Sequence, residues 1–207
     1  MKKFIVLLMT MSVVAGVAKA DDTSAMILEH ISKTLSGYGN YEVKFTARTK
    51  GFVANGTYRA SGDKYRIKVQ DQEHFSDGVN RYEIYDKDKE IVIDEVDTSS
   101  HNILNNPTRA FEFADSEFES TYKGRQQFGR VEVETVRLVP RTTRYGEVVI
   151  TLYVNAANGL PAGLEYDSRG DKLTISIDKI TPLDHIDPSV FMLDPSLYAD
   201  YEIIDFR

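Results

Sequence analysis

Apolar and polar residues alternate with a period of two along most of the chain, a pattern typical of half-buried β-strands. The apolar positions are odd-numbered in residues 41–48 and even-numbered in 52–60. Glycine, asparagine and aspartate separate such segments, as at 158–159 and 169–170, where the pattern predicts hairpin turns. Strands are therefore predicted at 41–48, 52–60, 64–69, 73–86 with a turn at 76–78, 91–96, 118–122, 131–139, 147–154, 164–166, 172–180 and from 190 onward.

One segment near the start of the chain breaks this alternation. Ile27, Ile31 and Leu35 recur at a spacing of four residues, which places them on one side of a helix. Thr23 or Ser24 can cap its first turn, and Gly37 follows its last turn. We therefore expect an amphipathic helix over residues 22–36.

A second, shorter helix is predicted after the fifth group of strands. Asn106 followed by Pro107 is a favourable helix start, and the pattern continues to about residue 114 with Ala110 and Phe111 on one side. A long series of antiparallel strands with two short helices predicts a strongly curved sheet, an unclosed β-barrel capped by the helices.

The first twenty residues have the pattern of a cleavable export signal. Lys2 and Lys3 precede an apolar run over 4–17, and the small residues of Ala18-Lys19-Ala20 follow. The chain contains no cysteine, so no thiol could carry a lipid anchor after cleavage. We expect residues 21–207 to form a single domain that is soluble and unanchored after export.

Charge and motifs exclude several classes of function. The chain has 25 basic and 32 acidic residues, a formal net charge of −7, which disfavours nucleic acid as a partner. The four histidines lie far apart in sequence, and neither a zinc-protease motif, a serine nucleophile elbow nor a glycine-rich phosphate loop occurs. We expect no enzyme activity, no metal and no cofactor.

The alternation also places a set of aromatic and aliphatic side chains on the inward side of the strands. Two interpretations fit this pattern, a filled core and a cavity that holds a ligand, because periodicity does not tell whether the inside is full. The inward set comprises Phe45, Tyr58, Tyr65, Ile67, Tyr82, Ile84, Ile93, Ile150, Leu152, Leu173, Ile175 and Ile177.

The order of several short motifs behind the signal resembles the LolA-like family of periplasmic outer-membrane lipoprotein carriers. The resemblance covers essentially the whole of the chain after the signal. The motifs are Asn55-Gly56-Thr57-Tyr58, Phe75-Ser76-Asp77-Gly78 leading to Tyr82 and Tyr85, Asn106-Pro107, Val136-Arg137-Leu138-Val139-Pro140, Gly159-Leu160-Pro161 and Asp187-Pro188-Ser189-Val190-Phe191-Met192-Leu193.

This resemblance implies an open barrel whose apolar interior, formed by the inward set, takes the acyl chains of lipoproteins. Helices carrying Ile27, Ile31, Leu35, Ala110 and Phe111 would then act as its lid. Implied partners are lipoproteins, an inner-membrane ABC transporter that releases them and an outer-membrane acceptor, and we expect the carrier to be a monomer. The family's early Arg-Pro pair, thought to latch the lid, is replaced here by the turn at residues 61–64.

Two alternatives stay open from the sequence. The chain could instead be a shuttle or sensor for another amphiphile, such as a glycolipid or a mislocalised lipoprotein. It could also be a hydrolase that uses some of its scattered acidic residues, which would require a catalytic constellation in the cleft.

Overall fold

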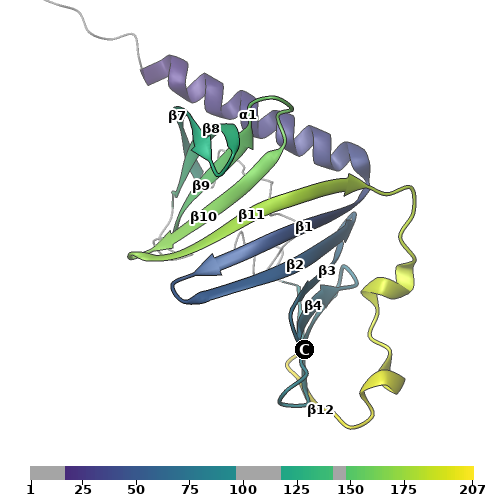
Figure 1. Ribbon diagram of the computed structural model, residues 1–207. Coiled ribbons are helices and arrows are strands. Elements are labelled where there is room, and N and C mark those ends of the chain that lie inside the picture. The colour runs from purple at the N-terminus through teal and green to yellow at the C-terminus, as the bar shows by residue number, and fades with distance from the viewer. Residues whose placement is uncertain (1–16, 97–117, 142–147) are drawn as a thin grey trace, which may run out of the picture.

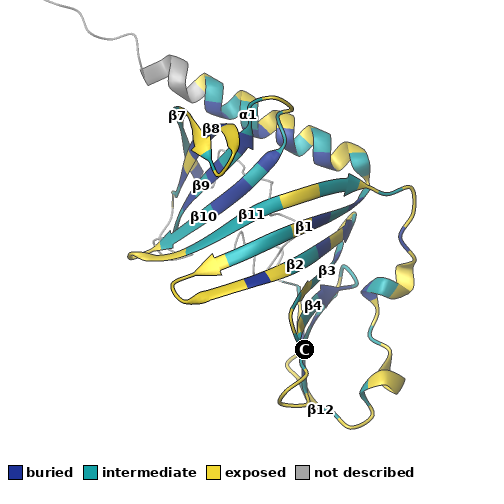
Figure 2. Cartoon of the chain, viewed as in Figure 1, coloured by how far each residue is buried: buried dark blue, intermediate teal, exposed yellow. Residues whose placement is uncertain are grey.

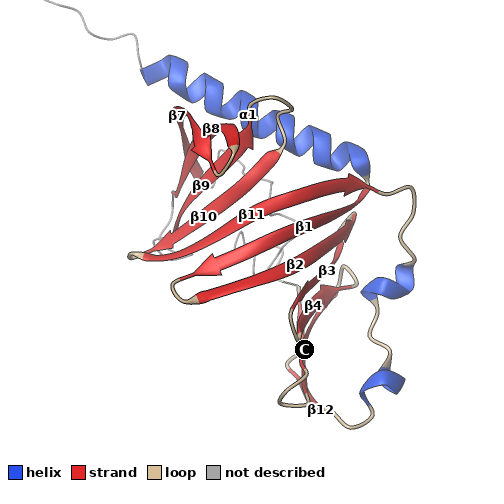
Figure 3. Cartoon of the chain, viewed as in Figure 1, coloured by secondary structure: helices blue, strands red, loops and turns tan. Residues whose placement is uncertain are grey.

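The computed structural model describes residues 17–96, 118–141 and 148–207, with side chains from Asp22 onward. Most of these residues belong to one long helix and a single sheet (Figure 3). The elements are α1 (Val17–Tyr38), β1 (Asn40–Thr49), β2 (Phe52–Ser61), β3 (Lys64–Val69), β4 (Gln72–Ser76), β5 (Asn80–Tyr85), β6 (Glu90–Glu95), β7 (Phe118–Phe128), β8 (Val131–Pro140), β9 (Val148–Asn155), β10 (Pro161–Ser168), β11 (Asp171–Pro182), η3 (Pro188–Phe191), η4 (Pro195–Tyr198) and β12 (Glu202–Asp205).

The sheet is open, curved and almost entirely antiparallel, which confirms the predicted fold class (Figure 1). Its described strands run in the order β12-β6-β5-β4-β3-β2-β1-β11-β10-β9-β8-β7. Two runs of consecutive hairpins, β2 to β6 and β7 to β11, are therefore joined through β1, which pairs with both β2 and β11. The edge strands are β12 and β7, and they do not pair with each other, so the sheet does not close into a barrel.

The helix α1 is longer than predicted and lies along the sheet from β7 toward the start of β1 (Figure 1). Its left-handed exit at Gly39, with φ of +67°, turns the chain directly into β1. The predicted short helix after Asn106, including Ala110 and Phe111, lies outside the described residues.

The C-terminal segment differs from the predicted strand that begins at residue 190. It instead forms two 3-10 helices, because Asp187 and Asp194 each cap a turn that begins with proline. The carboxylates accept hydrogen bonds from Ser189 N at 2.9 Å and from Ser196 N at 3.0 Å. The chain then reaches β6, where β12 pairs in parallel, the exception to the antiparallel pattern among the described strands (Figure 1).

Two faces of the sheet can be followed strand by strand, because residues directly opposite each other in an antiparallel ladder point to the same side. We call the face that packs against α1 the inner face and the opposite one the outer face. Burial follows this division in β1 and β2, where all the buried residues, Tyr41, Val43, Ala54, Tyr58 and Ala60, lie on the inner face (Figure 2).

Candidate functional site

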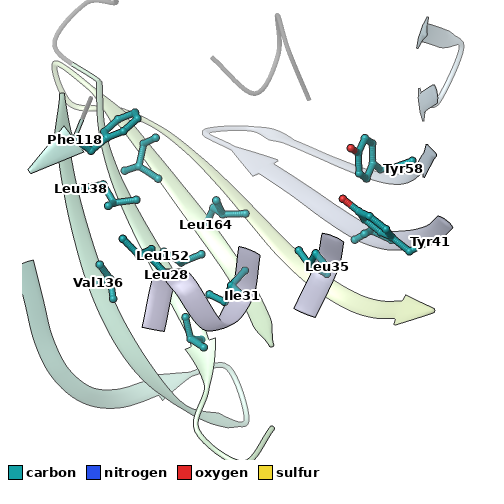
Figure 4. Packing of buried hydrophobic residues seen from close by; sticks show 14 of the residues in the cluster. Leu28, Ile31, Leu35, Tyr41, Tyr58, Phe118, Val136, Leu138, Leu152 and Leu164 are labelled. Carbon is teal, nitrogen blue, oxygen red and sulfur yellow. The ribbon is translucent and has the colours of Figure 1, made fainter. Parts of the chain in front are cut away.

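Helix α1 is fixed to the inner face by three aliphatic side chains that are almost fully buried. Leu28, Ile31 and Leu35 point toward side chains of the sheet and belong to its main apolar cluster (Figure 4). Beside them, the hydroxyl groups of Ser24 and Ser120 are 2.9 Å apart, which ties the helix to β7. The predicted residues Ile31 and Leu35 are thus buried and Ile27 is half-buried, whereas the sequence analysis did not name Leu28.

Nine of the twelve residues predicted to point inward do share the inner face. The ladders place Val43 opposite Tyr58, Tyr58 opposite Ile67, and Leu164 opposite both Ile175 and Leu152. The nine are Phe45, Tyr58, Tyr65, Ile67, Ile150, Leu152, Leu173, Ile175 and Ile177.

These nine residues differ in burial, and the difference separates core from accessible surface. Four of them are buried: Tyr58 and Tyr65 from the first half of the chain, and Ile150 and Leu152 from the second half. The other five, together with the unpredicted Tyr166, remain half-buried on β1, β3, β10 and β11. We call this set the apolar stretch; it consists of Phe45, Ile67, Tyr166, Leu173, Ile175 and Ile177.

The apolar stretch runs over β1, β11 and β10, with Ile67 on β3 beyond the buried Tyr58 of β2. Phe45 lies opposite Ile177, and Leu173 lies opposite Tyr166, so four of its members face each other across two ladders. The Tyr166 hydroxyl is uncharged at neutral pH, and burial raises its pKa further above the ordinary value of 10.0. An uncharged, partly accessible apolar surface of this kind suits a hydrocarbon chain.

The prediction that Tyr82, Ile84 and Ile93 share this face is wrong. Phe75 lies opposite both Arg66 and Tyr82, and Arg66 points away from its inward neighbours Tyr65 and Ile67. Tyr82 and Ile84 in turn lie opposite Ile93 and Ile91. All of these β4 to β6 side chains therefore stand on the outer face.

A second, separate apolar cluster covers that outer face. It joins Phe75, Tyr82, Ile84, Ile91 and Ile93 to Leu193, Tyr198 and Tyr201 of the C-terminal segment. The guanidinium of Arg66 lies 4.7 Å from the centre of the Phe75 ring, and its Nη1 donates to the carbonyl oxygen of Val190 at 2.8 Å. The C-terminal segment thus shields what would otherwise be an exposed apolar patch.

Where the outer face of β4 and β5 is apolar, their inner face is polar. His74, Arg81, Glu83 and Tyr85 stand there beside the buried Tyr65. The Tyr85 hydroxyl donates to Glu83 at 2.6 Å, and Arg81 Nη2 lies 3.3 Å from Glu83 Oε1. The sequence analysis missed this cluster, although the alternation of Arg81, Glu83 and Tyr85 with Tyr82 and Ile84 could have indicated it.

Arg59 and Arg66, which flank the turn at residues 61–64, point outward. Arg59 Nε donates to Glu42 at 2.8 Å, and Arg66 Nε donates to Glu73 at 2.9 Å, both on the outer face. Neither guanidinium therefore reaches the inner face, on which α1 packs.

The described residues offer no site for a metal ion, the polar side chains of β4 and β5 included. No group of three or more histidine, cysteine, aspartate or glutamate side chains in that part of the chain could hold a metal ion. His30 packs on Gly159 of the β9–β10 turn, where a methyl group would lie 2.6 Å from its Nε2. Among the described helices, none is both long and apolar enough to cross a membrane.

Comparisons with known proteins reveal relatives in structure and not in sequence. No family model matches the chain, and no curated protein matches it. An uncharacterized conserved protein from Thermus thermophilus is similar in structure with a TM-score of 0.62 and 10% sequence identity, over 88% of this chain and 99% of that one. A putative outer membrane lipoprotein-sorting protein domain from Vibrio parahaemolyticus has a TM-score of 0.51 and 8% identity, over 86% of this chain and 99% of that one.

At such low identity these likenesses establish a shared fold. The chain shares its fold with the putative outer membrane lipoprotein-sorting protein domain over 86% of its length, which agrees with the fold implied by the resemblance drawn from the sequence.

Proposed function

We propose that this protein is a periplasmic carrier that binds the acyl chains of lipoproteins and carries them from the inner to the outer membrane. The observation that carries the proposal is the apolar stretch, six half-buried side chains on the inner face beside α1. A folded domain gains stability by burying such residues fully, so a row of them left partly accessible suits a surface that a ligand completes.

The energetics favour incomplete burial of the cargo. Burying an acyl chain is worth roughly 0.8 kcal/mol per CH₂, so a chain of about sixteen carbons offers on the order of 12 kcal/mol. Two or three fully buried chains would exceed the practical limit of non-covalent affinity, about 20 kcal/mol, and would be released too slowly for a shuttle. A partly open apolar surface keeps the affinity within a reversible range.

The proposed site has a fixed wall in α1. Undocking the helix would expose Leu28, Ile31 and Leu35, each worth about 1.5–3 kcal/mol when buried. We infer that α1 stays docked while cargo enters, and that any movable part of the lid lies elsewhere. The assignment of Ala110 and Phe111 to such a lid stays a prediction from the sequence.

The proposed partners follow from the same function. They are the acylated lipoproteins, an inner-membrane ABC transporter that would supply them and an outer-membrane acceptor that would take them. We propose that the carrier acts as a monomer after removal of residues 1–20, without a cofactor and without chemistry of its own.

The other candidate cargo is a different amphiphile, such as a glycolipid. The polar side chains at one end of the inner face favour a ligand with a polar head as well as a hydrocarbon chain. Both candidates place the chain on the apolar stretch, so the identity of the bound molecule separates them.

The test is to express the protein with a lipidated cargo and to identify bound molecules by mass spectrometry after mild purification. Release of lipoprotein from spheroplasts into soluble complexes provides the second readout. Ile175→Asn should abolish both, whereas Thr174→Asn should not, because Thr174 stands on the outer face of the same strand. Absence of any co-purified amphiphile or soluble complex with the unaltered protein would overturn the carrier function.

A further inference from the structure

The inner face changes from apolar to polar along a row of residues that lie directly opposite each other on successive strands. This row runs from Val43 through Tyr58 and Ile67 to His74 and Glu83, and so passes from hydrocarbon to charge within five strands. Neighbouring strands lie about 4.8 Å apart, so the polar end begins one strand from the apolar stretch. A ligand on the stretch with its long axis across the strands reaches both regions.

Two buried donors at the polar end have no partner among the described residues. They are the hydroxyl of Tyr65, a residue only 1% exposed, and Nε of Arg81. Tyr65 and Arg81 flank Ser76 in one row, and Ser76 is small, fully buried and already engaged as the acceptor of the Gly78 N–H at 3.0 Å. The two long side chains therefore stand on either side of Ser76, and neither of the two donors forms a hydrogen bond with it.

The Tyr65 hydroxyl is a hydrogen-bond donor at neutral pH, and burial favours this protonated form further. Burial raises the pKa of Tyr65 to about 12, with smaller opposing effects of the charges on Arg81 and Glu83, so these two groups lie close enough to act on it. A buried donor without a partner costs free energy that a bound acceptor recovers. Two such donors in one row therefore favour a ligand that offers an acceptor oxygen.

The local charge selects against an anionic ligand. Arg81 Nη2 lies 3.3 Å from Glu83 and 3.6 Å from Asp94, so one cation already faces two carboxylates. His74, whose Nδ1 is 3.9 Å from Glu83, adds no full charge, because burial lowers its pKa more than Glu83 raises it. A phosphate placed here would meet excess negative charge.

We propose that Tyr65 and Arg81 form a polar subsite that binds a neutral acceptor, the ester or amide carbonyl joining an acyl chain to its head group. This proposal rests on the proposed function, since it needs the chain to lie on the apolar stretch. It adds a chemical class of cargo: acylated molecules with an uncharged linkage, in preference to alkyl chains without a carbonyl and to lipid phosphates.

The experiment compares three probes with the same chain length on the purified protein. Palmitoylglycerol has the ester carbonyl, the corresponding hexadecylglycerol ether lacks it, and hexadecyl phosphate carries negative charge. The unaltered protein should bind the ester roughly 3- to 10-fold more tightly than the ether, the equivalent of one net hydrogen bond, and should bind the phosphate most weakly.

The variant Tyr65→Phe should lose this preference by weakening ester binding alone. Its thermal midpoint should not fall, because the lost hydroxyl has no partner among the described residues of the unliganded protein. Tyr82→Phe is the matched control, since its hydroxyl donates to Asp77 on the outer face and should leave all three affinities unchanged.

The outcomes separate the two proposals. Equal binding of ester and ether by the unaltered protein, or an unchanged ester preference in Tyr65→Phe, would overturn the polar subsite and leave the acyl site in place. Preference for hexadecyl phosphate would overturn the choice of a neutral linkage. Failure of all three probes to bind would overturn the acyl site and the subsite together.

Discussion

The ring of Phe45 lies against Gly56, the residue directly opposite it on β2. A methyl group at position 56 would stand 2.4 Å from Cζ of Phe45, closer than two carbon atoms can approach. The missing side chain therefore leaves room for the outer end of the aromatic ring against the neighbouring strand. Gly56 thereby sets the position of Phe45 within the apolar stretch.

This contact makes Gly56→Ala destabilising. The added methyl group must displace the Phe45 ring, so the free energy of unfolding should fall by about 1–3 kcal/mol in urea titrations. Gly37→Ala is the control, because that site is open within α1 and alanine favours helix by about 0.5–1 kcal/mol. A loss at position 37 as large as that at 56 would contradict this account.

The division between the two faces predicts opposite behaviour for two isoleucines. Ile84→Ala should lower stability by about 2–5 kcal/mol without changing the affinity for an acyl probe, because Ile84 is buried under the C-terminal segment. Ile177→Ala should do the reverse, since Ile177 is half-buried in the apolar stretch. Titration with a fluorescent fatty acid, together with thermal unfolding, measures both, and weaker probe binding by Ile84→Ala would place the site on the wrong face.

Because α1 is docked on the sheet, truncating a buried side chain of the helix should lower the free energy of unfolding strongly, and truncating an exposed one should leave it nearly unchanged. Ile31 is fully buried, so Ile31→Ala should cost about 2–5 kcal/mol. Met26 is 70% exposed, and Met26→Ala should change stability by less than about 0.5 kcal/mol. Chemical unfolding of both variants checks the difference, and similar values would show that α1 is not anchored as described.

Acid should loosen the outer face of β3 and β4 through Glu73. Burial acts to raise the pKa of Glu73, but hydrogen bonds from Lys68 and Arg66 outweigh it and lower the pKa below the ordinary value of 4.5. The carboxylate therefore adds stability above that ordinary value, and this stability is lost as the pH falls through the lower pKa of the folded state.

The variant Glu73→Gln should consequently lose less stability than the unaltered protein when the pH is lowered from about 6 to about 3. The measurement is the free energy of unfolding at both pH values, with Asp184→Asn as a control at an exposed carboxylate. An identical pH dependence in Glu73→Gln and the unaltered protein would exclude Glu73 as a contributor.

Alternation predicted which residues of a strand share a side, but not which side that is. In β5 it groups Tyr82 with Ile84 correctly, yet the choice of face depends on the hairpins before it. The turn after Val69 pairs Tyr65 with Ser76 and Ile67 with His74, so the apolar side chains of β4 emerge on the outer face. Assigning these side chains to the outer face from the sequence would have required recognising that the C-terminal segment covers that face.

The C-terminal segment that covers the outer face was predicted as a strand from residue 190. Its motif at residues 187–193 was used only as part of the resemblance to the LolA-like family, and not as a sign of capped turns. The sequence Asp-Pro-Ser occurs at 187–189 and again at 194–196, and each copy caps a short turn. Two capped turns followed by aromatic residues Tyr198 and Tyr201 fit a segment that packs side chains onto a surface. The helix α1 was easier to predict, since a spacing of three and four residues defines its buried side without reference to distant partners.

The central position of β1 bears on how the molecule assembles. The hairpin runs β2 to β6 and β7 to β11 each form from neighbouring segments, whereas β1 must find β11 near the other end of the chain. Contacts between distant segments form slowly because closing a long loop costs entropy, so this seam is expected to set the folding rate. The complete sheet can therefore form only after β11, near the far end of the chain, has become available to pair with β1.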